Sequence, residues 1–205
     1  MNENNGVTIG EASNMRWITK APVYVVDKND FESLCRTLKE NIKYWKYGVV
    51  STGKGKNKPN PDVKKWNADV VRRADMADEM WGHEGIRAVY KLTEGPVAAM
   101  VMKSQDRDIR VEYLVSHIGA KNGGDILLEW AVNYSQDNGK NGILTLFDAT
   151  GTDYYKNLGF DPVSDDPGEK EMRLDPRAKS DKWVQVAEGE WKLTAFAAKQ
   201  YLESA

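Results

Sequence analysis

The stretch LTLFDATGTDYYKNLGF, residues 144–160, carries the most information about the fold. Its first residues, with Ile143 before them, are apolar and rich in β-formers, which predicts a strand over residues 143–147. A polar turn follows, and we expect a short helix over residues 151–158 that ends at Gly159. The stretch therefore predicts a strand–turn–helix unit.

A second unit of this kind lies upstream. Residues 109–115 predict a strand, residues 119–124 read GAKNGG, and an amphipathic helix continues to Asn138-Gly139. Glycine permits tight turns and close ligand approach, and the first helical turn offers unpaired N–H groups and a positive dipole end. The turn could hold a phosphate or pyrophosphate, or it could be an ordinary βα connection. It matches neither a P-loop nor the dinucleotide glycine pattern.

The remaining elements alternate less regularly than in a dinucleotide-binding fold. Short polar joins between the three central strands predict antiparallel hairpins. The expected elements are a strand at 23–26, helices at 29–44 and 62–81, strands at 86–92, 96–103 and 109–115, a strand at 172–174, and a strand pair or strand plus helix within 182–205. This order predicts an α+β (mixed α/β) fold with one central sheet.

The motif residues of both units resemble the GNAT superfamily of acyl-CoA-dependent N-acyltransferases. Tyr154-Tyr155 and Gly159-Phe160 match its second motif in place, whereas Asp148 stands where Asn is usual and Gly151 where Ala is usual. In the upstream acyl-CoA signature only Gly124 matches. Gly119 occupies the Arg/Gln place and Asn122 the first Gly place. The resemblance covers residues 86–174, and more loosely the chain from residue 23 onward.

The resemblance implies a mostly antiparallel central sheet flanked by helices, in which two parallel strands splay apart. It also implies transfer of an acetyl group from acetyl-CoA, used as cosubstrate, to an amine-bearing acceptor, which could be a protein or a small molecule. No metal is expected. The residues that it assigns to the cosubstrate are Leu114, Val115, Ser116, Lys121, Asn122, Gly123, Gly124, Asp125, Asp148 and Tyr154.

Acetyl transfer needs a base for the amine and an acid for the leaving thiolate. Tyr155 falls on the tyrosine of the superfamily motif and is the candidate acid, although a tyrosine here could simply pack. Glu112, in the strand before the turn, is the candidate base, or else a surface carboxylate paired with a cation. Strand alternation places Glu112 on one face with Leu114, opposite Tyr113. His117 could also act as a base or hold the loop.

The composition limits the kinds of partner and covalent link that the chain can have. The chain has 205 residues, with 29 Lys plus Arg against 31 Asp plus Glu, so its overall charge does not favour nucleic acid or acidic lipid. The single cysteine, Cys35, excludes an intramolecular disulfide and fits a helical apolar stripe. A basic cluster at Lys54, Lys56, Lys58, Lys64 and Lys65 could favour an acidic acceptor or be a solvated loop.

No apolar run approaches the length of a membrane helix, and the first ten residues contain no hydrophobic signal core. A cytoplasmic protein with no membrane partner is therefore expected, and a homodimer stays open. We expect a flexible segment at 1–17, a GNAT-like domain at 18–176 and a C-terminal extension at 177–205 packed on that domain. Two alternatives remain: a catalytically weak GNAT-like binding module, and a toxin or effector that acetylates a host protein or tRNA.

Overall fold

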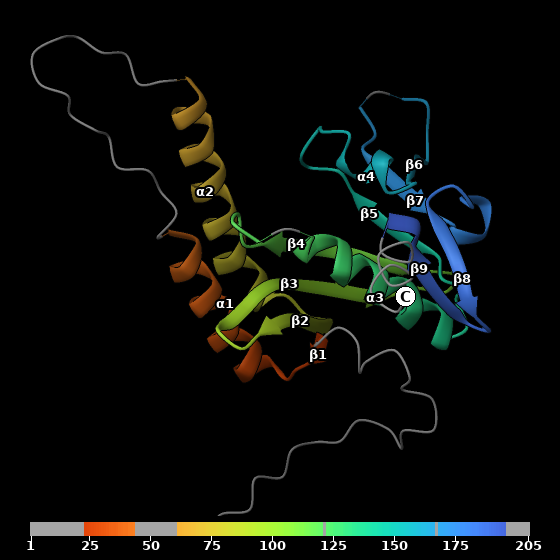
Figure 1. The fold of residues 1–205 in the computed structure, drawn as a ribbon, viewed down its shortest axis with the longest axis horizontal. Coiled ribbons are helices and arrows are strands. Elements are labelled where there is room, and N and C mark those ends of the chain that lie inside the picture. The colour runs from red at the N-terminus through yellow and green to blue at the C-terminus, as the bar shows by residue number, and fades with distance from the viewer. Residues whose placement is uncertain (1–22, 44–60, 121, 167, 196–205) are drawn as a thin grey trace, which may run out of the picture.

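The structure of the protein is a computed structural model that describes residues 23–43, 61–120, 122–166 and 168–195 (Figure 1). Its strands are β1 (Val23–Val25), β2 (Ile86–Leu92), β3 (Gly95–Ser104), β4 (Ile109–Ser116), β5 (Leu144–Phe147), β6 (Asp161–Pro162), β7 (Glu171–Leu174), β8 (Trp183–Ala187) and β9 (Glu190–Leu193). Its helices are α1 (Lys28–Lys43), α2 (Pro61–Glu79), α3 (Gly123–Asp137) and α4 (Tyr154–Asn157), with 3-10 turns η1 (Met80–Gly82) and η2 (Pro176–Ala178).

The central sheet has seven strands in the order β1-β2-β3-β4-β5-β7-β6. All neighbours are antiparallel except β4 and β5, which are parallel. The expected α+β class, the hairpins and the neighbouring parallel pair are therefore confirmed. The expected closing strand, β7, pairs with β5, and β6 lies outside it as the edge strand.

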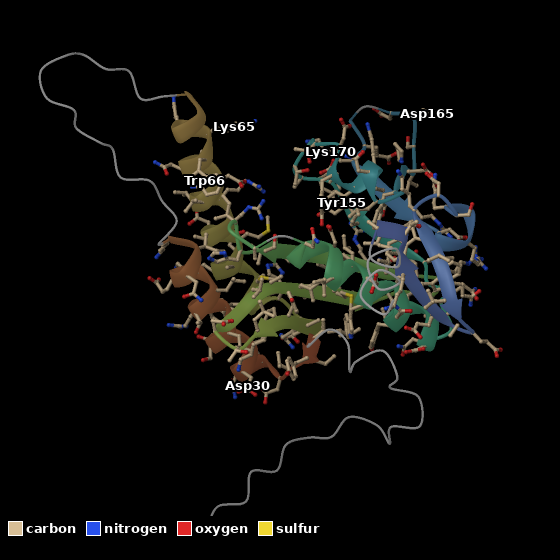
Figure 2. All side chains as sticks on the ribbon, in the orientation of Figure 1. Asp30, Lys65, Trp66, Tyr155, Asp165 and Lys170 are labelled. Carbon is tan, nitrogen blue, oxygen red and sulfur yellow. The ribbon has the colours of Figure 1, made fainter. Side chains whose placement is uncertain are left out.

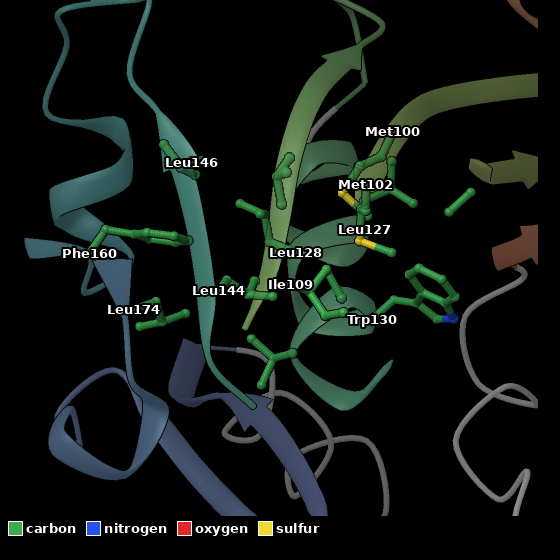
Figure 3. Close-up of a cluster of buried hydrophobic side chains, with 14 of the residues drawn as sticks. Met100, Met102, Ile109, Leu127, Leu128, Trp130, Leu144, Leu146, Phe160 and Leu174 are labelled. Carbon is green, nitrogen blue, oxygen red and sulfur yellow. The ribbon is translucent and has the colours of Figure 1, made fainter. Parts of the chain in front are cut away.

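Helices cover both faces of the sheet, and each face has its own apolar cluster. The apolar stripe of α1 (Phe31, Cys35, Leu38, Ile42) is fully buried with residues of α2 against Val89, Ala99, Val101 and Val115. On the other face, Leu127, Leu128 and Trp130 of α3 pack on Met100, Met102, Ile109 and Leu144 (Figure 3). Burial also raises the pKa of the Cys35 thiol to about 12, so this cysteine belongs to the core as expected.

Local signals define α1 slightly differently from the sequence expectation. The helix begins at Lys28, and the Asp27 side chain accepts a hydrogen bond from the Asp30 N–H at 2.9 Å. Asp27 therefore caps the helix. The predicted stop of α3 is confirmed, because Gly139 adopts a φ of 73° directly after the helix.

A bulge in β4 changes which side chains share a face. The β3–β4 register shifts between Val101 and Met102, so that Tyr113 lies opposite Val101, Val111 lies opposite Met102, and Glu112 has no partner. Beyond this bulge, Leu114 packs with the α3 cluster and Tyr113 with the α1–α2 cluster. The alternation that placed Glu112 on one face with Leu114 was wrong, because an extra residue reverses the pattern.

The β8–β9 hairpin packs against α3. Trp183, Trp191 and Leu193 are buried in the α3 cluster. The Asn133 amide pairs with both backbone groups of Trp191, at 2.9 and 2.8 Å. The half-buried Glu129 carboxylate accepts the Leu193 N–H at 2.9 Å. Burial raises the pKa of Glu129, opposed by this hydrogen bond.

Candidate active site

The parallel strands β4 and β5 are paired over a short distance only. Their register joins Ile109 to Leu144 and Val111 to Leu146, and β4 then continues to Ser116 alongside β3 alone. The bulge at Glu112 stands where the two strands separate. The part of β4 beyond the bulge has no second strand partner among the described residues. It contains the residues that the resemblance assigns to the cosubstrate, Leu114, Val115 and Ser116.

The glycine turn leads from β4 directly into α3. Asn122 adopts a left-handed φ of 63° at the helix N-cap position, a conformation that Asn tolerates better than most residues. A Cβ on Gly123 would lie 3.4 Å from the Cβ atoms of Ala98 and Ser116, so the start of α3 packs closely on β3 and β4. Lys121 lies outside the described residues.

Tyr154 lies over the start of α3. Its hydroxyl donates a hydrogen bond to Asp125 Oδ1 at 2.7 Å. A Cβ on Gly124 would approach this hydroxyl to 2.6 Å, so the position needs glycine to make room for Tyr154. Burial raises the pKa of Tyr154, and the hydrogen bond to Asp125 raises it further. Two residues assigned to the cosubstrate are thus bound to each other.

Tyr155, the candidate acid, lies in the buried cluster with its ring edge-on to Phe160, at a centroid distance of 5.7 Å. Burial raises the pKa of Tyr155 to about 12. The negative charge of Asp148 contributes to this rise, whereas the positive charges of Arg72 and Arg73 oppose it. The hydroxyl is therefore protonated at neutral pH, and burial makes it a weaker acid than a solvent-exposed tyrosine. Figure 2 shows Tyr155 on the side of α4 that faces α2.

Asp148 organises the turn between β5 and α4. Its Oδ1 accepts hydrogen bonds from the Thr150 N–H at 2.9 Å, the Thr150 hydroxyl at 2.6 Å and the Gly151 N–H at 3.2 Å. An aspartate is suited to this turn because one carboxylate oxygen can accept several local donors. Its role in the structure is to hold the turn that precedes the two tyrosines.

Glu112, the candidate base, lies among charged side chains. Its carboxylate is 3.3 Å from Arg110 Nε and 3.9 Å from Lys103 Nζ. Arg110 also pairs with Glu171 of β7 at 3.2 Å. The structure therefore contains the cationic partners that the alternative interpretation of Glu112 expected, and the Glu112 side chain is 25% exposed.

His117 joins the turn to α1. Its Nδ1 accepts the Gly119 N–H at 3.2 Å, and its Nε2 lies 3.3 Å from the Asn41 carbonyl. Burial lowers the pKa of His117, opposed by the Asn41 carbonyl. Because both ring nitrogens have partners, the structure favours the loop-holding role over the role of a base.

Arg73 of α2 is a site residue that the sequence analysis did not identify. Its Nη1 donates to the Ser116 carbonyl and hydroxyl oxygens, each at 2.9 Å. Its Nε donates to Asp69 Oδ2 at 2.9 Å. No local motif marks this residue, since Ser116 is distant in sequence and the adjacent Arg72 looks equivalent.

A groove of about 620 Å³ runs along one face of α2, lined by Asn67, Ala68, Val71, Arg72, Asp75, Met76 and Glu79. Arg72, which lines this groove, also lowers the pKa of Tyr155 through its positive charge. Of the basic cluster, Lys64 and Lys65 lie on α2, whereas Lys54, Lys56 and Lys58 lie outside the described residues.

Two absences hold within the described residues. No group of three or more His, Cys, Asp or Glu side chains there is arranged to hold a metal ion. None of the described helices is both long enough and apolar enough to cross a membrane.

The family model for Nodulation outer protein P matches residues 98–205. No curated protein matches the sequence.

Solved structures to which the chain is similar include these three. PaiA N-acetyltransferase from Thermoplasma acidophilum, in complex with coenzyme A, is 15% identical, with 75% of this chain and 97% of that chain covered and a TM-score of 0.46. The ribosomal-protein-S18-alanine N-acetyltransferase from Escherichia coli is 10% identical, with 74% and 91% covered and a TM-score of 0.44. FdhC, a nucleotide-linked sugar GNAT, is 14% identical, with 78% and 89% covered and a TM-score of 0.43.

Proposed function

The chain belongs to the Nodulation outer protein P family, and we propose that it is an N-acetyltransferase that uses acetyl-CoA. The observation that carries this proposal is the separation of β4 from β5 after Val111, directly beside the glycine turn of α3. An extended ligand with amide groups can pair with an unpaired strand edge, and the first turn of α3 can receive a phosphate group. Pantetheine and the diphosphate of acetyl-CoA supply these two features in one molecule.

In the proposed reaction the neutral acceptor amine attacks the thioester carbonyl, and the tetrahedral intermediate expels the CoA thiolate. Glu112, directly or through water, takes the proton from the amine nitrogen. Tyr155 gives its hydroxyl proton to the thiolate sulfur and regains one from solvent. Backbone N–H groups of β4 near Leu114 are candidates to stabilise the oxyanion. The groove on α2 is the candidate approach for the acceptor.

We also propose that residues 18–176 form the catalytic domain and that residues 177–205 are an extension packed on it. The burial of Trp183, Trp191 and Leu193 against α3 supports this division. The remaining assignments to Asn122, Gly123, Gly124 and Asp125 are proposals for the cosubstrate diphosphate.

A catalytically weak binding module is the second candidate, favoured by the hydrogen bond from Tyr154 to Asp125 at the start of α3. The hydrogen bond between Tyr154 and Asp125 must break if a diphosphate approaches Gly124. The family's description as an outer protein supports a third candidate, an effector that acetylates a host protein or tRNA. That candidate shares the chemistry and differs in the acceptor and in the compartment, since a cytoplasmic location is the prediction from sequence.

Titration calorimetry with acetyl-CoA tests the proposal first. Micromolar binding is expected, followed by release of free CoA thiol when lysine peptides, polyamines or tRNA are screened as acceptors. Mass spectrometry should find a gain of one acetyl group on the acceptor. Binding without CoA release from any acceptor would favour the binding module, and no binding at all would refute the proposed cosubstrate.

A further inference from the structure

The glycine turn of the proposed site has one lysine in its sequence, Lys121, which lies outside the described residues. A diphosphate brings negative charge, and the described residues of the turn and the start of α3 (117–120 and 122–125) contain no Lys or Arg. Gly119 stands where the acyl-CoA signature of the GNAT superfamily has Arg or Gln, and Asp125 adds a carboxylate. If this chain binds acetyl-CoA as proposed, a cation from another element would add to Lys121.

The side chain of Arg73 reaches this place from α2. Its Nη1 lies 2.9 Å from both the carbonyl oxygen and the hydroxyl oxygen of Ser116, the last residue of β4. The Ser116 Cβ is in turn only 3.4 Å from the position of a Cβ on Gly123, the first residue of α3. The guanidinium is therefore held where the free part of β4 ends and α3 begins.

The Arg73 guanidinium keeps its positive charge and some of its N–H donors available to a ligand at the junction of β4 and α3. Asp69 binds its Nε at 2.9 Å and so orients the guanidinium plane. Within the described residues, the Nη2 group makes no hydrogen bond, and the side chain is 28% exposed. An arginine fork of this kind is suited to phosphate oxygens because its N–H donors are rigidly arranged. Its positive charge also lowers the pKa of His117, Tyr154 and Tyr155, which surround the turn.

We propose that Arg73 is a binding residue for the diphosphate of acetyl-CoA and adds, from α2, a positive charge beside the glycine turn. This inference rests on the proposed function. Asp69 is its positioning residue. The Ser116 hydroxyl and carbonyl hold the guanidinium before the ligand arrives.

The neighbouring Arg72 offers a matched control. Both arginines pair with Asp69, and Arg72 is 49% exposed, but no hydrogen bond joins Arg72 to β4 within the described residues. The variants Arg73→Met and Arg72→Met remove the same charge from adjacent positions of one helix. Thermal unfolding of each variant checks that the fold is intact.

Calorimetry of these variants uses three ligands. These are acetyl-CoA, 3′-phosphoadenosine 5′-diphosphate, which has the diphosphate without pantetheine, and S-acetylpantetheine, which has the thioester without phosphate. Loss of a charge-assisted hydrogen bond weakens binding about ten- to a hundredfold. We expect that loss for Arg73→Met with the two diphosphate ligands only, and near wild-type binding for Arg72→Met.

The outcomes separate the inference from the proposed function. A wild-type protein that binds none of the three ligands refutes the proposed function. Wild-type binding of acetyl-CoA with no loss in Arg73→Met, or with an equal loss in Arg72→Met, refutes the role of Arg73 and leaves the function standing. If Arg73→Met unfolds, Arg73→Lys replaces it. The charge is then kept without the planar fork, so a smaller loss confined to the same two ligands is expected, and unchanged binding of both contradicts the inference.

Discussion

Gly124 and Tyr154 should be energetically coupled. A Cβ at Gly124 would lie 2.6 Å from the Tyr154 hydroxyl oxygen, and ordinary contact is about 3.5 Å. Gly124→Ala must therefore push the hydroxyl away by about 1 Å. The same hydroxyl donates to Asp125 at 2.7 Å, so a displacement of this size breaks or bends that hydrogen bond.

The sign of the effect depends on the residue at position 154. In a helix, Ala is favoured over Gly by about 0.8–1 kcal/mol, whereas a hydrogen bond to a charged group contributes about 1.5–3 kcal/mol. In the wild-type background, Gly124→Ala should lower the free energy of unfolding by about 1 kcal/mol. In the Tyr154→Phe background the clashing oxygen is absent, and the next atom of residue 154 lies 3.6 Å away, so the same substitution should stabilise the protein by about 0.5–1 kcal/mol.

Urea denaturation of the four proteins in this double-mutant cycle measures the coupling energy. A coupling of about 1.5 kcal/mol or more is expected, with a change of sign for Gly124→Ala between backgrounds. Additive effects, with Gly124→Ala equally destabilising in both backgrounds, would show that Tyr154 is not the reason for glycine at this position.

Three further substitutions test single side chains. Tyr155→Phe should lower kcat of acetyl transfer about 10²-fold while leaving acetyl-CoA affinity and Tm nearly unchanged; steady-state kinetics with unchanged kcat would exclude this hydroxyl as the acid. Burial raises the pKa of Glu129 in the folded protein, whereas its pKa in the unfolded chain is about 4.3. The free energy of unfolding of the wild type should therefore fall as pH rises from about 4.3 through the pKa of the folded state. Glu129→Gln should abolish this fall in urea titrations across pH, and parallel curves would contradict it. Because burial lowers the pKa of His117, its contribution to stability should be complete above about pH 6.5 and should be lost as pH drops below that value. His117→Asn should remove this decline in the same urea titrations, and an equal decline in the variant would contradict it.

The sequence predicts the strands and their neighbours well because those signals are local. The alternation and turn chemistry around residues 86–115 predict the β2–β3–β4 hairpins that the structure contains. The bulge at Glu112 has no such signal, because a bulge is a property of the register between two strands. One unpaired residue was enough to place Tyr113 and Leu114 on the wrong faces.

The candidate site is harder to predict because its side chains are paired across elements that are distant in the sequence. Arg72 and Arg73 are adjacent and equally charged, and only the packing of α2 beside β4 brings Arg73 to Ser116. The helical period alone cannot distinguish them, since both lie outside the buried stripe of Val70, Ala74 and Ala77.

The two tyrosines show how one motif can combine structure and chemistry. Tyr154 and Tyr155 are consecutive, so their side chains leave the short helix about 100° apart. The first reaches Asp125 and closes over Gly124, whereas the second turns into the cluster beside Phe160 and, within the described residues, makes no hydrogen bond through its hydroxyl. Glycine at position 124 is thereby favoured even without a ligand, because a Cβ there would crowd the Tyr154 hydroxyl. A substitution there tests the protein's own packing before it tests cosubstrate binding, and Arg73, which takes no part in that contact, is the cleaner probe of the diphosphate site.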